Sequence, residues 1–242
     1  MYQERAYRRV AHAPDLVAFE VEVKETNLWV QAECDLSVPC KEIVGRLRDE
    51  IESYISYHPG FAASLLPVRP FAFSAPVIQL MANASNAANV GPMAAVAGAI
   101  AEFLGEELSP RSPELIVENG GDIFLRSERP RIVAVYAGAS PFSQRLGLKV
   151  ESRGKPMGIC TSSATVGHSL SLGAADAAVI LANSAALADA VATRVGNRIQ
   201  QKGDIPAALE LAQSIPGVTG ALVVLGGDLG AWGDLEMVDL AG

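Results

Sequence analysis

The order of hydrophobic patterns along the chain is the feature that most constrains its fold. Residues 17–23 and 28–32 alternate apolar with polar side chains on either side of a short polar turn, which is typical of an antiparallel hairpin. From Ser37, a residue that can cap a helix, apolar residues recur at helical spacing until His58, so a helix should cover this hairpin. Later hairpin and helix patterns follow without regular strand–helix alternation. This order favours an α+β fold over a parallel α/β fold.

The rest of the chain continues this order without a shift in composition that would mark a linker. We therefore predict one domain spanning residues 1–242. Residues 115–126 and 221–230 each combine an apolar strand with a following Gly-Gly-Asp, an echo that can be a duplication or two similar turns. Further strands are expected at 115–117, 123–125, 132–136, 146–150, 177–181, 221–225 and 235–238, helices at 185–201 and 207–215, and an extended connection at 61–76.

A helix opened by Gly91-Pro92 carries very little side-chain bulk. Its apolar residues follow helical spacing, but most of the positions around them are alanine or glycine. A glycine inside a helix costs up to about 1 kcal/mol relative to alanine, so Gly98 indicates that another element approaches closely. That element can be a sheet or a second copy of the chain, and a homo-oligomer is one expectation.

Charge and cysteine content narrow the function classes. With 19 basic and 27 acidic residues the net charge is −8, so nucleic acid and anionic membranes are not expected partners. The 3 cysteines form no C-x-x-C pair, which argues against a disulfide framework. The first residues contain no signal-like apolar run, and the longest uncharged apolar stretch, 90–101, is too short to cross a bilayer. We expect a cytoplasmic protein.

The first candidate site is the run Glu118, Asn119, Gly120, Gly121 and Asp122 between two expected strands. Paired glycines allow positive φ and let backbone N–H groups converge on an anion, while the two carboxylates could face a metal or a ribose hydroxyl. The alternative is a plain hairpin turn, for which Gly-Gly is equally suited.

The second candidate is residues 158–171, which combine several hydroxyls with Cys160 and His168. Such a loop could wrap phosphate or sugar oxygens, with His168 as a general acid or base. Cys160 or Ser163 paired with His168 would instead suggest acyl transfer, although the G-x-S-x-G elbow is missing. A surface loop rich in serine and threonine is the third interpretation.

The third candidate is a polar stripe on the helix expected at 185–201. Asp189, Thr193 and Asn197 are spaced four residues apart and therefore share one helix face. A carboxylate, a hydroxyl and an amide suit an oxygen-liking cation such as Mg²⁺. A solvent-facing polar side is the alternative.

Taken in order, these segments resemble the ApbE-like superfamily, whose characterised members are FAD:protein FMN transferases. The match is most similar to the uncharacterised, soluble ApbE-like branch and extends over nearly the whole chain. The motifs that carry it are HPGF at 58–61, NVGPMAAVAGAIAE at 89–102, ENGGDI at 118–123, GICTSSATVGHSLSLGAADA at 158–177 and LADAVAT at 187–193.

The resemblance implies a fold, a ligand and roles for particular residues. The fold would be α+β, with T-fold-related antiparallel sheets flanked by helices, and the ligand FAD, FMN or a related nucleotide with Mg²⁺. His168 would be catalytic or position the substrate, and Asp189 with Thr193 would hold Mg²⁺. The flavin nucleotide would lie against Glu118, Asn119, Gly120, Gly121, Asp122, Thr161, Ser162 and Ser163.

Departures from the transferase motifs leave two main functions open. The helix 91–102 lacks the transferases' lysine, and no D-P-x-T-G follows His168. One hypothesis is a Mg²⁺-dependent FMN transferase or pyrophosphate-cleaving enzyme. The alternative is a non-catalytic protein of the same fold that binds an anion or a flavin.

Overall fold

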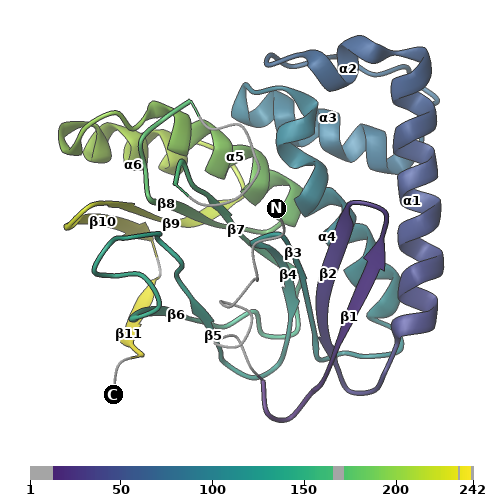
Figure 1. The fold of residues 1–242 in the computed structure, drawn as a ribbon, viewed down its shortest axis with the longest axis horizontal. Helices are drawn as coiled ribbons and strands as arrows, with labels where there is room; N and C mark the ends of the chain where they lie inside the picture. Colours follow the sequence, from purple (N-terminus) through teal and green to yellow (C-terminus); the bar gives the residue numbers. More distant parts are fainter. Residues whose placement is uncertain (1–12, 166–171, 234, 241–242) are drawn as a thin grey trace.

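The fold, seen in a computed structural model, is built on a large antiparallel sheet (Figure 1). The structure describes residues 13–165, 172–233 and 235–240. The eight strands of this sheet lie in the order β1-β2-β3-β4-β7-β8-β9-β10, and a three-stranded sheet has the order β11-β6-β5. The strands are β1 (Val17–Val23), β2 (Thr26–Ala32), β3 (Leu115–Asn119), β4 (Asp122–Arg126), β5 (Arg131–Ala134), β6 (Leu146–Val150), β7 (Met157–Ser162), β8 (Ala177–Ala182), β9 (Val218–Leu225), β10 (Asp228–Gly233) and β11 (Glu236–Asp239).

The helices lie on one face of the large sheet and the three-stranded sheet on the other (Figure 1). Successive side chains of β4 show the two layers, because Phe124 packs among the helices while Ile123 and Leu125 pack toward the small sheet. This arrangement confirms the expected α+β class. The helices are α1 (Ser37–Tyr57), α2 (Pro59–Ala63), α3 (Pro76–Ala88), α4 (Val96–Leu108), α5 (Ala185–Arg198) and α6 (Ile205–Gln213), with 3-10 turns at Pro92–Ala95 and Lys202–Asp204.

The large sheet consists of two halves with the same order of elements. β1 and β2 lead through helices to β3 and β4, and β7 and β8 lead through helices to β9 and β10. Gly120-Gly121 and Gly226-Gly227 join the last two strands of each half. The sequence echo between 115–126 and 221–230 therefore corresponds to equivalent hairpins.

Several local predictions were wrong. Helix α3 and a short helix, α2, lie where we expected an extended connection or no element, and β7 and β10 lie in segments interpreted as loops. Ser37 does not cap α1: the capping position is Leu36, and the Ser37 N–H donates to Asp35 Oδ1 at 2.8 Å. The hairpin β1–β2 and its cover by α1 agree with the prediction.

Helix α4 packs closely against the start of α5. A Cβ atom added to Gly98 would lie 2.3 Å from the Ala185 carbonyl oxygen. That separation is far inside van der Waals contact, so glycine is required there. The expected close approach is therefore made by another helix, where we expected a sheet or a second copy of the chain.

The two helices also satisfy each other's first N–H groups. Glu102 Oε2 on α4 accepts hydrogen bonds from Ser184 Oγ at 2.7 Å and from the Ala186 N–H at 2.9 Å, at the start of α5. Asp189 Oδ2 on α5 accepts one from the Gly98 N–H at 2.9 Å, at the start of α4. The N–H groups in the first turn of a helix have no partner within the helix, and these hydrogen bonds provide one. The bonds also fix the position of α5 relative to α4.

Truncating Glu102 should therefore loosen α5. We expect Glu102→Ala to lower the free energy of unfolding by about 2 kcal/mol, because it removes a charged acceptor from two buried donors. Urea denaturation measures this change. Glu106→Ala, at an exposed position of the same helix, is the control and should stay within about 0.5 kcal/mol of the native protein. Equal effects of the two substitutions would contradict the capping role.

Within the described residues, no single helix is both long and apolar enough to cross a membrane. Among the helices that the structure describes, one pair, Pro76–Ala88 with Pro92–Leu108, reaches the required length and composition together, and this pair is bent by 104°.

Candidate functional site

Candidate residues of the β3–β4 turn and of α5 lie close together near the middle of the large sheet, where α4 and α5 cover β4 and β7 (Figure 1). The turn from β3 to β4 is tied to α4 because Asn119 Nδ2 donates to the Ala97 carbonyl at 3.0 Å. Asp189 joins α5 to the next residue of α4, Gly98. The segments around 118–122 and 189 are thus neighbours in space.

The Gly-Gly turn is a tight two-residue hairpin. Gly120 and Gly121 have φ of 70° and 107°, and the flanking Asn119 and Asp122 are paired across the strands. Added Cβ atoms would meet nothing within 4 Å, so the backbone conformation and not crowding requires glycine. The Gly121 N–H donates to Glu118 Oε1 at 2.9 Å, which uses one of the N–H groups expected to face an anion.

Asp122 and Cys160 form a buried pair across β4 and β7. Their positions are opposite each other in the strand register, and both side chains lie on the face covered by helices. The Cys160 thiol donates to the Ala185 carbonyl at 3.3 Å. Asp122 is only 9% exposed, and its Oδ1 atom is buried without a hydrogen-bond partner in the described part of the chain. A native structure rarely leaves a buried carboxylate oxygen without a partner, so this atom is available to accept a hydrogen bond or to coordinate a cation.

Two neighbouring carboxyl groups at this place have raised pKa values. Burial, reinforced by the charge of Glu118, raises the pKa of Asp122 to about 7. Burial and then the charge of Asp122 raise the pKa of Asp189 well above its ordinary value, against the N–H groups of Gly98 and Ala97. A cation between the two would relieve both effects.

The environment of Cys160 does not suit a nucleophile. Burial raises the pKa of the thiol, and the charges of Asp122 and Asp189 raise it further. Reactive cysteines need the opposite, an accessible site that favours the thiolate. The geometry therefore gives no support to the acyl-transfer hypothesis through Cys160.

The hydroxyl residues begin as a strand and not as a loop. Ser162 lies on the helix face, where its Oγ would be 3.2 Å from a Cβ added to Gly196 of α5. Thr161 alternates to the opposite face, opposite Val179. Ser163 follows the strand, with its Oγ 3.3 Å from Thr165 Oγ1. The side chains of Ser162 and Thr161 therefore lie on opposite faces of the large sheet.

The polar stripe of α5 is anchored at both ends. Asp189 accepts the Gly98 N–H, and Asn197 Oδ1 accepts the Leu172 N–H at 2.8 Å. Thr193 lies between them and is partly buried. The stripe therefore faces protein, contrary to the solvent-facing alternative. His168 lies outside the described residues.

The donor set for a metal is limited. Among the described residues, no group of three or more histidine, cysteine, aspartate or glutamate side chains is arranged to hold an ion. The backbone of Ala97 and Gly98 was missed as a part of the site, and Cys160 was considered as a nucleophile and not as a buried neighbour of Asp122. The only sequence signal for the backbone contact was the costly glycine in a helix of small residues.

Solved structures define the class to which this fold belongs. The flavin transferase ApbE of Vibrio cholerae, in a variant form, superposes with a TM-score of 0.60 at 12% identity, covering 90% of this chain and 96% of that one. The Pseudomonas stutzeri flavinyl transferase ApbE gives 0.54 at 14% identity, over 90% and 93% of the two chains. The ApbE protein of Thermotoga maritima gives 0.54 at 12% identity, over 89% and 96%. The protein has the ApbE-like fold.

Sequence comparison identifies the family to which this chain belongs. A family model described as AbpE bacteria matches residues 8–230, and the chain belongs to this family. A UPF0280 protein of Methanocella arvoryzae is 38% identical over 218 residues, or 90% of this chain and 89% of that protein. A UPF0280 protein of Methanocaldococcus jannaschii is 41% identical over 219 residues, or 88% and 89% of the two chains. The expected membership of the ApbE-like superfamily is confirmed.

Proposed function

We propose that the protein binds FAD or a related flavin nucleotide through a divalent cation held by Asp122, Asp189 and Thr193. The observation that carries this proposal is the buried, unpartnered Oδ1 atom of Asp122 beside a second carboxylate whose pKa is raised. The ApbE-like fold supports flavin as the ligand, since two of the similar structures are named flavin or flavinyl transferases.

The residues present suit Mg²⁺ better than a softer metal. Asp122 offers a free oxygen, Asp189 offers a second carboxylate whose Oδ2 accepts the Gly98 N–H, and Thr193 adds a hydroxyl on the same helix face as Asp189. Mg²⁺ prefers such oxygen ligands and keeps several waters or phosphate oxygens in its shell. Two carboxylates and a hydroxyl are therefore a sufficient protein contribution.

The charge of the site explains why a nucleotide would need the cation. Asp122, Asp189 and Glu118 would repel the pyrophosphate of FAD, whose charges are also negative. The turn itself leaves room, because Gly120 and Gly121 have open space where side chains would be. A nucleotide could thus approach the backbone once the carboxylates are neutralised.

The reaction that this arrangement suits best is cleavage of the pyrophosphate with transfer of FMN. An acceptor oxygen forms a bond to the FMN phosphorus while the bond from that phosphorus to the bridging oxygen breaks, and AMP leaves with that oxygen. A bound divalent cation would offset the charge that develops on the phosphates. His168, which the sequence suggests as a general acid or base, would take the proton of the acceptor hydroxyl. Binding without turnover is the second candidate, favoured by the absence of a lysine in 91–102.

Calorimetry with FAD, with and without Mg²⁺, tests the proposal. We expect binding that requires Mg²⁺ and that weakens at least tenfold in both Asp189→Asn and Asp122→Asn, because each removes a charged ligand of the cation. Asp228→Asn is the matched control, since Asp228 follows the second Gly-Gly pair but is exposed. Chromatography of AMP and FMN separates turnover from binding alone.

Two results would contradict the proposal. FAD binding of equal strength without Mg²⁺ would remove the need for a cation. Unchanged affinity in the Asp189→Asn protein would place the ligand elsewhere.

A further inference from the structure

A second cavity lies at the carboxyl end of α1, remote in sequence from the proposed flavin site. Its volume is about 360 Å³, and its walls come from the last turns of α1, the segment before α3 and the first turn of α3. None of its lining residues belongs to the site around Asp122. The residues that the argument uses are Glu50, Tyr54, Tyr57, His58 and Phe73.

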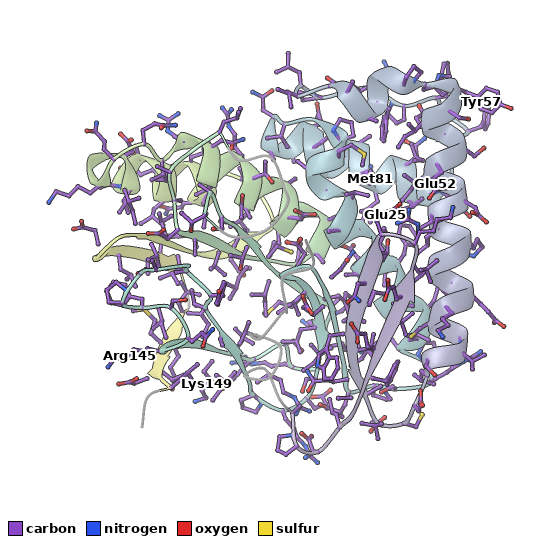
Figure 2. All side chains as sticks on the ribbon, viewed as in Figure 1. Glu25, Glu52, Tyr57, Met81, Arg145 and Lys149 are labelled. Carbon is purple, nitrogen blue, oxygen red and sulfur yellow. The ribbon has the colours of Figure 1, made fainter. Side chains whose placement is uncertain are left out.

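Aromatic rings dominate these walls. The Tyr54 and His58 rings lie 4.7 Å apart between centroids, and the His58 ring lies 4.6 Å from that of Phe71. The Tyr57 and Phe73 rings lie nearer to the protein surface than the Tyr54 and His58 rings. Figure 2 shows Tyr57 at the outer edge of the molecule, whereas Met81 of α3 lies inside.

The outer rings are exposed although the backbone beneath them is well fixed. Phe73 is 101% exposed and Tyr57 79% exposed. The Phe71 carbonyl accepts hydrogen bonds from the Ser74 N–H at 3.1 Å, Ser74 Oγ at 2.8 Å and Gln79 Nε2 at 2.7 Å. This tight turn holds Phe73 beside the cavity, and rings presented together in this way are typical of a binding surface.

The acidic group that lines the cavity favours a cationic ligand. Glu50 lies one helical turn before Tyr54 on α1, and its carboxylate is the acidic group among the lining residues, which include no lysine or arginine. Arg46 approaches Glu50 at 3.3 Å from the preceding turn, and the Glu50 side chain remains 30% exposed. Aromatic faces and a carboxylate both attract cations, and the net charge of −8 adds to this attraction.

We propose that this cavity binds an organic cation, namely an alkylated ammonium group lodged between Tyr54, Tyr57 and Phe73 with Glu50 as its counter-charge. The volume is at the lower end of the usual range for ligand pockets, so one cationic group with short substituents fits it. The group can belong to a free small molecule or to a methylated lysine side chain, and the chemistry is the same for both.

Nuclear magnetic resonance titration with choline tests the proposal. The control ligand is 3,3-dimethylbutan-1-ol, which has the same shape without the charge. We expect choline to shift the resonances of Tyr54, Tyr57 and Phe73 and the neutral alcohol to bind at least fivefold more weakly. A peptide with trimethyl-lysine, titrated beside the unmodified peptide, distinguishes the two sources: stronger binding than choline identifies the side chain, and equal or weaker binding the free cation.

Substitutions locate the binding in the cavity. Phe73→Ala and Glu50→Gln should each weaken choline binding by about two- to fivefold. Leu66→Ala, which truncates an exposed apolar residue outside the cavity, should leave it unchanged. Equal binding of choline and the neutral alcohol, no binding of either cation, or unchanged affinity in the Phe73→Ala protein would each overturn the proposal.

Discussion

Replacing Gly98 with alanine is expected to lower the free energy of unfolding by about 3 kcal/mol. The new methyl group would lie 2.3 Å from the Ala185 carbonyl oxygen and 2.8 Å from the Asp189 Cβ atom. Neither neighbour is the flexible end of a long side chain, so relief requires α4 and α5 to move apart. That movement would also strain the bond between the Gly98 N–H and Asp189 and the bonds of Glu102.

Urea denaturation of Gly98→Ala beside Gly45→Ala measures this effect. Gly45 lies within α1, and a Cβ atom there would meet nothing within 4 Å. Alanine should therefore stabilise the protein by about 0.5–1 kcal/mol at Gly45, because it favours the helix and restricts the unfolded chain. Stabilisation of both variants would show that the α4–α5 contact adjusts easily to a methyl group, contrary to the expectation.

The parts of the fold that were predictable are those whose patterns are local. The β1–β2 hairpin and α1 follow from alternation and helical periodicity within short windows. Helix α3 was missed because Pro76 closes a proline-rich stretch, and we took the following helix to begin only at Gly91-Pro92. A buried helix of small and apolar residues has a weak pattern, since its stability comes from packing against α1 and α5.

The candidate site was predictable in its parts but not in its contacts. Asp122 and Asp189 were each selected from their local setting, but the sequence does not show that the two carboxyl groups are neighbours or that Asp122 is buried. Their meeting depends on the register that places Asp122 opposite Cys160, and β7 was interpreted as a loop. Such pairings join residues far apart in the chain, so a local pattern carries no information about them.

The two halves of the sheet show what makes the first Gly-Gly-Asp turn distinct. Both turns precede an aspartate at the start of the last strand of the half, but Asp122 is 9% exposed whereas Asp228 is exposed. Asp122 lies in the middle of the sheet, where β7 continues it and α4 and α5 cover it. β10 is an edge strand of the described sheet, so no further strand lies beside Asp228. The difference in burial follows from position in the sheet, since the motif is the same.

Burial of Asp122 leads to the second large prediction, which concerns pH. An acid whose pKa is raised on folding binds its proton more tightly in the folded state, so its contribution to stability falls as pH increases. The pKa of Asp122 is raised from 3.8 to about 7, so this loss develops between about pH 4 and pH 7 and is complete above pH 7. Without a bound cation, Asp122→Asn should therefore be about 2 kcal/mol more stable than the native protein at pH 8.

At pH 4 that advantage should disappear, because the native carboxyl group is then protonated and neutral. Other carboxylates cause acid unfolding, so the quantity to measure is the difference in unfolding free energy between Asp122→Asn and the native protein, by urea denaturation from pH 4 to pH 8. Asp228→Asn should show no such trend. Added Mg²⁺ should stabilise the native protein at pH 8 and leave Asp122→Asn almost unchanged, since binding to the folded state alone shifts the equilibrium. A pH-independent difference would mean that Asp122 stays ionised without cost, and that its buried oxygen has a partner already.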